Sequence, residues 1–290
     1  MRIAIFGTPA AGRQTGKERS FFDLLNSYND EIMIEESFLR FLNGELGLNI
    51  SCKSIISNDN FTADAVISIG GDGTFLRTAA HVGAKNIPML GINTGRLGFL
   101  ADVTEQKADQ AIRLLHDGRY TLERRTLLEI QTDALPQGYT PFALNDIAIL
   151  KHDISSMISI HTCVDGKPLT TYMADGLVVA TPTGSTAYSL SVGGPVIAPG
   201  TEVMELTPVA PHSLTMRPLI LQSSRLITLT VESRSHSFLI SIDGRSFRCP
   251  DGTEIGIRQA DFKINVIKPD GSDFFSTLRE KMMWGADSRQ

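Results

Sequence analysis

Over residues 1–118, short apolar runs alternate with longer segments in which apolar residues recur every three or four positions. The runs predict buried strands at residues 2–6, 50–56, 65–69 and 87–92. The periodic segments predict helices at residues 31–46, 75–82 and 104–118, the last of which ends at an Asp-Gly pair. Strands that alternate with helices in this way are typical of a parallel sheet with helices on both faces.

The pattern changes near Tyr120, where segments that predict strands begin to follow one another directly, at residues 122–132, 142–150, 157–164, 177–180, 226–232, 238–242 and 262–267. Asp-Gly pairs at residues 165–166, 243–244, 251–252 and 270–271 predict tight turns of the kind that hairpins need. We therefore predict an α/β domain with a Rossmann- or flavodoxin-like parallel sheet over residues 1–119. A mainly-β, sandwich-like domain is predicted over residues 120–273, and a short helical tail, residues 274–290, is predicted to return to the first domain.

One predicted strand runs directly into the sequence Gly70-Gly71-Asp72-Gly73-Thr74. A strand, a glycine loop and a helix in succession bring bare backbone amides beside a phosphate. A loop that only holds an anion should not carry Asp72, because like charges repel. The carboxylate is explained if it faces a hydroxyl that it orients or deprotonates, or a bound cation. The motif thus indicates phosphoryl transfer, and the alternative is a structural turn in which Thr74 caps the helix.

Further polar groups follow other predicted strands. A second glycine loop at residues 93–100 is expected to border the same crevice as Asp72. Arg77, in the first turn of the predicted helix, either reaches a phosphate or is a solvated helix residue. Asn145 and Asp146 interrupt an apolar strand, which indicates either a β-bulge or a nucleoside site. An Asn amide can pair with an adenine edge, and an ionised Asp can accept bonds from ribose hydroxyls.

The densest group of small polar residues lies at residues 174–195. An apolar strand meets Thr-Pro-Thr-Gly-Ser-Thr, and a helix-compatible run follows. Ser185 and Thr186 can cap that helix and offer amides and hydroxyls to a polar ligand, and Tyr188 can stack on a base. The alternative is a strand, a turn and a capped helix without a ligand.

Composition limits the function classes. Lys and Arg number 27 and Asp and Glu 32, a formal net charge of −5, which argues against a nucleic-acid-binding protein that relies on bulk positive charge. No apolar stretch approaches the roughly 20 residues that span a bilayer, and the apolar N-terminal run is too short for a signal peptide. The three cysteines, Cys52, Cys163 and Cys249, form no Cys-x-x-Cys pair and fit reduced thiols in a cytoplasmic protein rather than metal ligands.

These blocks together resemble the NAD kinase family. The resemblance is carried by residues 70–74, by Asn93-Thr94-Gly95 with Leu97-Gly98-Phe99, by Asn145-Asp146, by residues 175–195, and by Pro211-His212-Ser213-Leu214 with Arg217-Pro218-Leu219. Diacylglycerol-type lipid kinases and phosphofructokinases share the glycine–aspartate block. The block at residues 181–195 is what separates this family from those two.

The resemblance implies transfer of a terminal phosphoryl group, usually from ATP, to the adenosine ribose 2′-hydroxyl of NAD, giving NADP. It implies a divalent cation, usually Mg²⁺, and a homodimer or homotetramer. In this family's pattern Asp72 would orient or deprotonate the hydroxyl, Gly73 would pass close to the substrate, and Asn145 and Asp146 would bind adenine and ribose. The rest of the dinucleotide site, including its nicotinamide end, would be lined by Asp175, Thr186, Ala187, Tyr188, Ser189, Leu190 and Ser191.

Two positions depart from the family's pattern. Arg245 stands where many members have Gln, and a cation there suits either a phosphate or a contact with a neighbouring subunit. Met173 stands where some members have a basic residue, which weakens a phosphate contact or marks a branch of the family. Two other functions remain open at this point: a lipid kinase with the same loop, and a dinucleotide sensor without catalysis. The donor, ATP or polyphosphate, and the choice between NAD and NADH are open as well.

Overall fold

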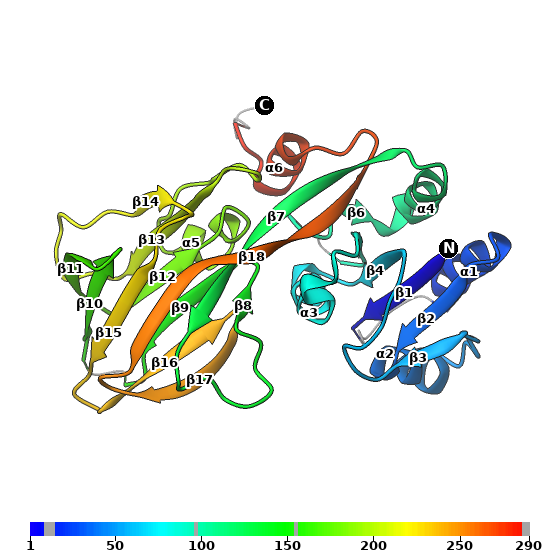
Figure 1. Cartoon of the computed structure of the whole chain (residues 1–290). Coiled ribbons are helices and arrows are strands. Elements are labelled where there is room, and N and C mark those ends of the chain that lie inside the picture. The colour runs from blue at the N-terminus through cyan, green and yellow to red at the C-terminus, as the bar shows by residue number, and fades with distance from the viewer. Residues whose placement is uncertain (9–14, 96–97, 154–155, 286–290) are drawn as a thin grey trace. The chain divides into compact units, whose positions relative to one another are not determined.

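The structure is a computed structural model that describes residues 1–8, 15–95, 98–153 and 156–285, with only the backbone described at residues 15–18. The chain forms two compact units (Figure 1). Unit 1 comprises residues 1–124 and 264–290, and unit 2 comprises residues 125–263. Two long strands, β7 (Tyr120–Gln131) and β18 (Glu254–Pro269), each run from one unit into the other.

Unit 1 is built from strands that alternate with helices along the chain. Its elements are β1 (Arg2–Gly7), α1 (Thr15–Ser27), β2 (Glu31–Glu35), α2 (Glu36–Arg40), a π-helical turn (Phe41–Glu45), β3 (Ser54–Ile56), β4 (Ala65–Ile69), α3 (Asp72–Val82), a 3-10 turn (Gly83–Lys85), β5 (Met89–Asn93), β6 (Val103–Thr104), a 3-10 turn (Glu105–Lys107), α4 (Ala108–His116) and α6 (Phe274–Met282).

The strands of unit 1 form a parallel sheet in the order β3-β2-β1-β4-β5, with β6 and the end of β18 both pairing with β5. The sequence moves one way from β1 to β2 and the other way from β1 to β4, so the strand order reverses between β1 and β4. In such sheets ligands bind outside the carboxyl ends of the strands at this reversal. Gly7 and Ile69 are the last residues of these two strands, and residues 70–74 follow directly.

The predicted helix at residues 31–46 is wrong in its first five residues, which form β2. Ile32 and Ile34 are buried at alternate positions and pair with β1, so the period there is that of a strand. The helix begins after Glu35, whose carboxylate accepts hydrogen bonds from the N–H groups of Ser37 and Phe38, both at 2.9 Å. Sequence analysis assigned no element to α1, whose Phe22 and Leu25 are fully buried.

Unit 2 consists mainly of antiparallel strands. Its elements are β8 (Phe142–Ala143), β9 (Asp146–Lys151), β10 (Ile158–Val164), β11 (Lys167–Ala174), β12 (Gly176–Ala180), a 3-10 turn (Gly184–Thr186), α5 (Tyr188–Ser191), β13 (Val203–Val209), β14 (Leu219–Gln222), β15 (Ile227–Glu232), β16 (Ser237–Ile242) and β17 (Arg245–Pro250). Of these, β11, β13, β14 and β17 were not predicted.

Two antiparallel layers enclose the core of unit 2. One follows the order β14-β13-β12-β9-β16-β17, and the other joins β11, β10, β15 and β18. Side chains from both layers share one buried cluster, for example Ile149 and Val179 from the first and Ile160 and Leu229 from the second. The predicted fold class, a parallel α/β domain with a mainly-β, sandwich-like partner, is confirmed. In the described part of the chain, no helix is both long and apolar enough to cross a membrane.

Candidate active site

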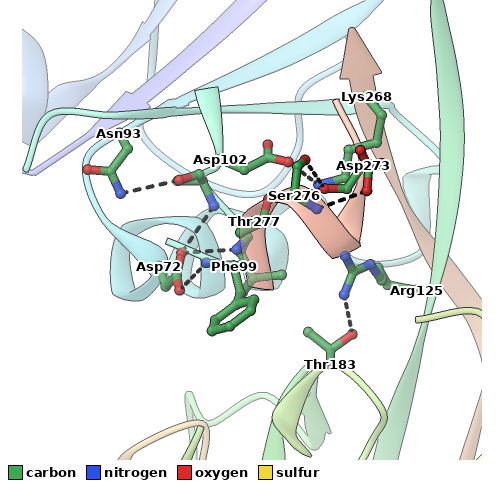
Figure 2. A network of polar contacts seen from close by, with 12 residues as sticks. Asp72, Asn93, Phe99, Asp102, Arg125, Thr183, Lys268, Asp273, Ser276 and Thr277 are labelled. Atoms are coloured by element: carbon green, nitrogen blue, oxygen red, sulfur yellow. Dashed lines mark hydrogen bonds and ion pairs between the residues drawn. The ribbon is translucent and has the colours of Figure 1, made fainter. Parts of the chain in front are cut away.

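Asp72 is the first residue of α3, and its carboxylate is fixed by backbone groups (Figure 2). Oδ2 accepts a hydrogen bond from the N–H of Phe99 at 2.9 Å, and Oδ1 accepts from the N–H groups of Leu100 and Ala101, both at 3.1 Å. An acidic residue in the first helical turn is also favoured by the helix dipole. The carboxylate is therefore held in one orientation before any substrate binds.

The loop that supplies these N–H groups follows β5 and is shaped by Asn93. The buried Asn93 side chain accepts from the N–H of Gly95 at 2.7 Å and donates to the carbonyl of Ala101 at 3.2 Å. Gly98 closes the contact, because a Cβ at this position would overlap the Asp72 carboxylate. The predicted second glycine loop thus lies beside Asp72, although Arg96 and Leu97 fall outside the described residues.

Arg77 lies one turn beyond Asp72 in α3, and its guanidinium donates to the hydroxyls of Thr8 and Thr74. These two hydroxyls are also 2.7 Å from each other, so they join the end of β1 to the start of α3. A cavity of about 160 Å³ opens here, lined by Phe6, Gly7, Glu35, Ser37, Thr74, Arg77, Thr78 and His81. Pockets for whole small-molecule ligands run to roughly 300–1,000 Å³, so this cavity is too small to enclose a nucleotide.

Gly73 lies in the first turn of α3 next to Asp72. A Cβ at Gly73 would meet no atom within 4 Å, so the space beside its backbone is open. The close approach of a substrate to Gly73, which the family resemblance implies, stays a prediction.

In unit 2, Asn145 lies between β8 and β9. Its backbone is held by Asp243, which sequence analysis assigned only to a turn. Asp243 accepts hydrogen bonds from the N–H groups of Leu144, Asn145 and Asp146 at 2.8, 2.8 and 3.1 Å. The side-chain Oδ1 of Asn145 is buried and has no hydrogen-bond partner. Since unpaired buried acceptors are costly, this atom is suited to receive a donor from a ligand, such as an adenine amino group.

Asp146 is buried, with 6% of its surface exposed. Burial raises the pKa of its carboxyl to about 7, and the nearby charge of Asp243 adds to the rise. Burial also raises the pKa of Asp243, while its three N–H donors and the charge of Arg245 oppose that rise. The Asp146 carboxyl therefore has a pKa close to neutral pH.

The segment after β12 packs directly on Asn145. The Thr181 N–H donates to the Asn145 carbonyl at 2.9 Å, and the Thr181 hydroxyl donates to the carbonyl of Leu144 at 2.6 Å. The Gly184 N–H returns to the same hydroxyl at 3.1 Å. A Cβ at Gly184 would overlap the Asn145 carbonyl oxygen, so only glycine allows this approach.

The residues of α5 and the two that precede it differ in exposure. Thr186, Ala187 and Leu190 are half-buried, whereas Tyr188 and Ser191 are exposed. Burial raises the pKa of the Tyr188 hydroxyl, and the charges of Asp146 and Asp175 contribute, which places all three groups in one electrostatic environment. The Ser189 side chain is fully buried and lies 3.0 Å from the Thr207 hydroxyl, which donates to Glu205 at 2.6 Å.

Asp175 connects β11 to β12 and forms an ion pair with Lys151. Lys151 Nζ lies 2.7 Å from Asp175 Oδ1. Lys151 also lines a cavity of about 680 Å³ with Met173, Met157 and Arg234 among its walls. Met173 is half exposed on β11 and borders this cavity.

Several residues of these groups were missed by sequence analysis. Asp243 was seen only as half of an Asp-Gly turn, and its φ of 47° belongs to that turn. Lys151 pairs with Asp175 only because β9 and β12 are antiparallel neighbours. Arg125 is buried in β7 and donates to the Thr183 hydroxyl at 3.1 Å (Figure 2). Each contact joins parts of the chain that are distant in sequence, so no local sequence pattern predicts it.

The donor set bears on the implied divalent cation. Among the described residues, no group of three or more His, Cys, Asp and Glu side chains is arranged to hold a metal ion. Mg²⁺ usually binds through one or two carboxylates together with substrate phosphates. Asp72 offers one such carboxylate, so the residues fit a cation that arrives with a phosphoryl donor.

Family models match most of the chain. Residues 31–120 match the ATP-NAD kinase N-terminal domain, and residues 144–269 match the ATP-NAD kinase C-terminal domain. An NAD kinase of Bacteroides fragilis is 52% identical over 289 residues, and the match covers 100% of both chains. An NAD kinase of Porphyromonas gingivalis is 44% identical, with 99% of both chains covered.

Two solved structures are similar over nearly the whole chain. The yeast NADH kinase complexed with NADH has a TM-score of 0.87 and 25% identity, covering 99% of this chain and 89% of that one. The NAD kinase from Archaeoglobus fulgidus in complex with ATP has a TM-score of 0.75 and 26% identity, covering 98% of this chain and 99% of that one.

Proposed function

The chain belongs to the NAD kinase family, and we propose that it transfers the terminal phosphoryl group of ATP to the 2′-hydroxyl of the adenosine ribose of NAD, giving NADP. The observation that carries the proposal is the Asp72 carboxylate, fixed by three backbone N–H groups at the end of the parallel sheet. Both matched domain models are NAD kinase models, which decides against the lipid-kinase alternative.

In the proposed reaction, Asp72 accepts the hydrogen bond of the ribose 2′-hydroxyl and aims its oxygen at the terminal phosphorus. The new O–P bond forms while the bond to the leaving diphosphate oxygen breaks, and the hydroxyl proton passes to Asp72 and then to solvent. Phosphoryl transfer needs positioning and charge stabilisation more than strong bases, so an oriented carboxylate is enough. A divalent cation bound with the donor would neutralise charge on its phosphates.

The donor phosphates are assigned to unit 1. Arg77 and Thr74 line the cavity of about 160 Å³ at the end of β1, together with Glu35. Thr8 is hydrogen-bonded to both Arg77 and Thr74. Helix N-termini and Arg side chains are the usual partners of phosphate oxygens.

The dinucleotide is assigned mainly to unit 2. Asn145 would pair with the adenine edge through its unpartnered Oδ1, and Asp146 would accept a ribose hydroxyl. Tyr188 offers an aromatic face, and Asp175 with residues 186–191 would line the rest of the site. The Ser189 hydroxyl is buried and contacts that of Thr207, so Ser189 would contribute through its backbone and not through its hydroxyl. Arg245 and Met173 lie at the margins, near Asp243 and in the larger cavity respectively.

The direct test is to incubate the purified protein with NAD, ATP and Mg²⁺ and to measure NADP. Parallel reactions with NADH as the acceptor and with other triphosphates or polyphosphate as the donor define the substrate range. NADP formation is expected with at least one donor. Tight NAD binding without product from any donor would instead identify a dinucleotide sensor.

The proposal extends to assembly and location. A homodimer or homotetramer is expected from the family resemblance, and light scattering on the purified protein measures it. The described cysteines are all free thiols, and Cys249 is buried, which fits a reducing compartment such as the cytoplasm. Fractionation of the producing cells tests that location.

A further inference from the structure

The C-terminal helix α6 carries a lysine beside the loop that holds Asp72. Phe274, Leu278 and Lys281 are spaced four and three residues apart and therefore lie on one side of the helix. Leu278 is buried, and the Phe274 ring lies 6.2 Å from that of Phe99. Phe275 and Arg279 lie on the exposed side. Lys281 is itself partly exposed, but its side chain lies beside the loop that holds Asp72.

Lys281 reaches the Asp72 carboxylate and the ring beneath it. Its Nζ lies 3.5 Å from Asp72 Oδ2 and 4.6 Å from the centroid of the Phe99 ring. The second distance is within the range of a cation–π contact. Among the described residues, Lys281 is the cation that pairs with Asp72. At 3.5 Å the pair is longer than a charge-assisted hydrogen bond of about 2.7–2.9 Å, so the ammonium keeps its N–H groups free for another acceptor.

The two carboxylate oxygens of Asp72 differ in what they can still accept. Oδ1 already accepts two backbone N–H groups, from Leu100 and Ala101, whereas Oδ2 accepts only that of Phe99. A carboxylate oxygen offers two lone-pair sites, so Oδ2 is the atom left to receive a substrate hydroxyl. Lys281 lies beside this same oxygen.

We propose that Lys281 is a positioning residue for phosphoryl transfer, acting on Asp72 from the C-terminal helix. The ammonium fixes Oδ2 for the ribose hydroxyl and places positive charge where negative charge gathers during the transfer. Preorganised charge of this kind stabilises the transition state more than the ground state. This inference rests on the proposed function and adds a residue that neither the glycine–aspartate motif nor the dinucleotide segment contains.

The position of Lys281 allows a clean test. The two side chains are about one-third exposed, and ion pairs of this kind contribute roughly 0–1 kcal/mol to stability, so removing the charge should leave the fold intact. The variants are Lys281→Gln, Lys281→Arg, Asp72→Asn and the double variant Asp72→Asn with Lys281→Gln. Arg279→Gln is the matched control, because it removes a cation from the exposed face of the same helix.

Steady-state rates of NADP formation and thermal melts are measured for all five variants and the wild type. Lys281→Gln is expected to lower kcat by about 10- to 100-fold while KM for NAD changes by less than about threefold, since the lost interaction forms in the transition state. Lys281→Arg should recover most of the rate, and Arg279→Gln should stay within about twofold of wild type. In the Asp72→Asn background, Lys281→Gln should have little further effect, because residues that act as a unit are not additive.

Three results would overturn the inference. One is a kcat for Lys281→Gln close to wild type, and another is a full further loss in the Asp72→Asn background, which would make Lys281 independent of Asp72. The third is a rate loss that merely follows a fall in melting temperature. In each of these the wild type still makes NADP, so the proposed function stands. Absence of NADP from the wild type would overturn both.

Discussion

For the glycine–aspartate loop, sequence analysis offered a structural turn and a phosphoryl-transfer site as alternatives, and the contacts of Asp72 are compatible with both. Its carboxylate joins the start of α3 to the loop after β5, and its Oδ2 keeps a lone-pair site that the proposed reaction uses. A carboxylate that accepts N–H groups is oriented without the reorganisation that a free side chain would need. The structural contacts therefore support the chemistry instead of competing with it.

Asp72→Asn should lower kcat by about 10²–10⁴-fold with a smaller change in KM for NAD, because general-base help is worth about that much. An amide in this place also turns an N–H donor toward other N–H donors, and one such mismatch costs roughly 1–3 kcal/mol of stability. Rates and thermal melts are measured together, with Asp109→Asn, an exposed acid in α4, as the control. An unchanged rate in a folded Asp72→Asn protein would remove Asp72 from the chemistry.

Asp146 gives a prediction in which pH matters. Its pKa of about 7 in the folded chain lies above that of an unfolded Asp, so the folded state holds a proton that the unfolded state releases. The free energy of unfolding must then fall as pH rises from about 4 to 7. Asp146→Asn should weaken this dependence, leaving the part due to Asp243, whose pKa burial also raises. It should also raise the melting temperature at pH 8, relative to wild type at the same pH.

The same substitution should weaken substrate binding, because the ionised carboxylate is the better acceptor for a ribose hydroxyl. KM for NAD in the wild type is therefore expected to fall between pH 6 and pH 8, and in Asp146→Asn to be higher and nearly flat. Thermal melts and KM values over pH 5–9 measure both effects. A wild-type KM that does not vary with pH would assign the ribose to another group.

At the scale of elements, the turn between β12 and α5 depends on a glycine that touches Asn145. Gly184→Ala would push a methyl group into the Asn145 carbonyl oxygen and displace either that residue or the turn. Overpacking of this kind usually costs about 1–3 kcal/mol, which corresponds to a rise in KM for NAD of about 5- to 150-fold if the cost falls on the binding site.

Gly256→Ala in β18 is the matched control, because a Cβ there meets only ordinary contacts of 3.4 Å from Gln131. This control should bind NAD like the wild type. KM for ATP should stay within about threefold in Gly184→Ala, since the donor is assigned to the other unit. Equal losses for NAD and ATP would indicate general damage to the fold and not a local effect on the dinucleotide.

Sequence patterns predicted elements where one kind of period persists. The buried run of β4 and the helix after it follow directly from apolar spacing and glycine placement. The segment at residues 31–46 failed because it contains two periods in succession, with Ile32 and Ile34 alternating before the helix begins at Glu36. In β13, the buried positions include the polar residues Glu205 and Thr207, so the apolar pattern that predicts a strand is absent.

The proposed site residues also divide into those that a local sequence pattern predicts and those that it does not. Asp72, Asn145 and Asp146 stand next to glycines or inside apolar strands, so their chemistry is visible locally. Asp243 holds the backbone of residues 144–146 from about 98 positions away along the chain. Such contacts depend on which strands become neighbours, and that is set by the fold of the whole unit.

On the scale of the whole molecule, the proposed chemistry is divided between two units with separate cores. One buried cluster contains side chains of unit 1 alone and the other contains side chains of unit 2 alone. A ligand stabilises the part of a protein that it binds, by about 2.7 kcal/mol at a concentration 100 times its Kd. Donor and acceptor should therefore protect largely different stretches of the chain, apart from the backbone next to Asp72, which the proposed reaction places beside the ribose hydroxyl.

Amide hydrogen exchange, read by mass spectrometry with each substrate alone, measures that protection. NAD is expected to slow exchange in residues 144–149 and 181–192, where Asp243 and Thr181 fix the backbone around Asn145. ATP with Mg²⁺ is expected to slow exchange in residues 70–78, around Arg77 and the start of α3. With Arg77→Gln, protection by ATP should fall while protection by NAD persists. If NAD protected residues 70–78 and left unit 2 unchanged, the assignment of the dinucleotide to Asn145 and Asp146 would have to be abandoned, because binding there must restrain the amides that carry those side chains.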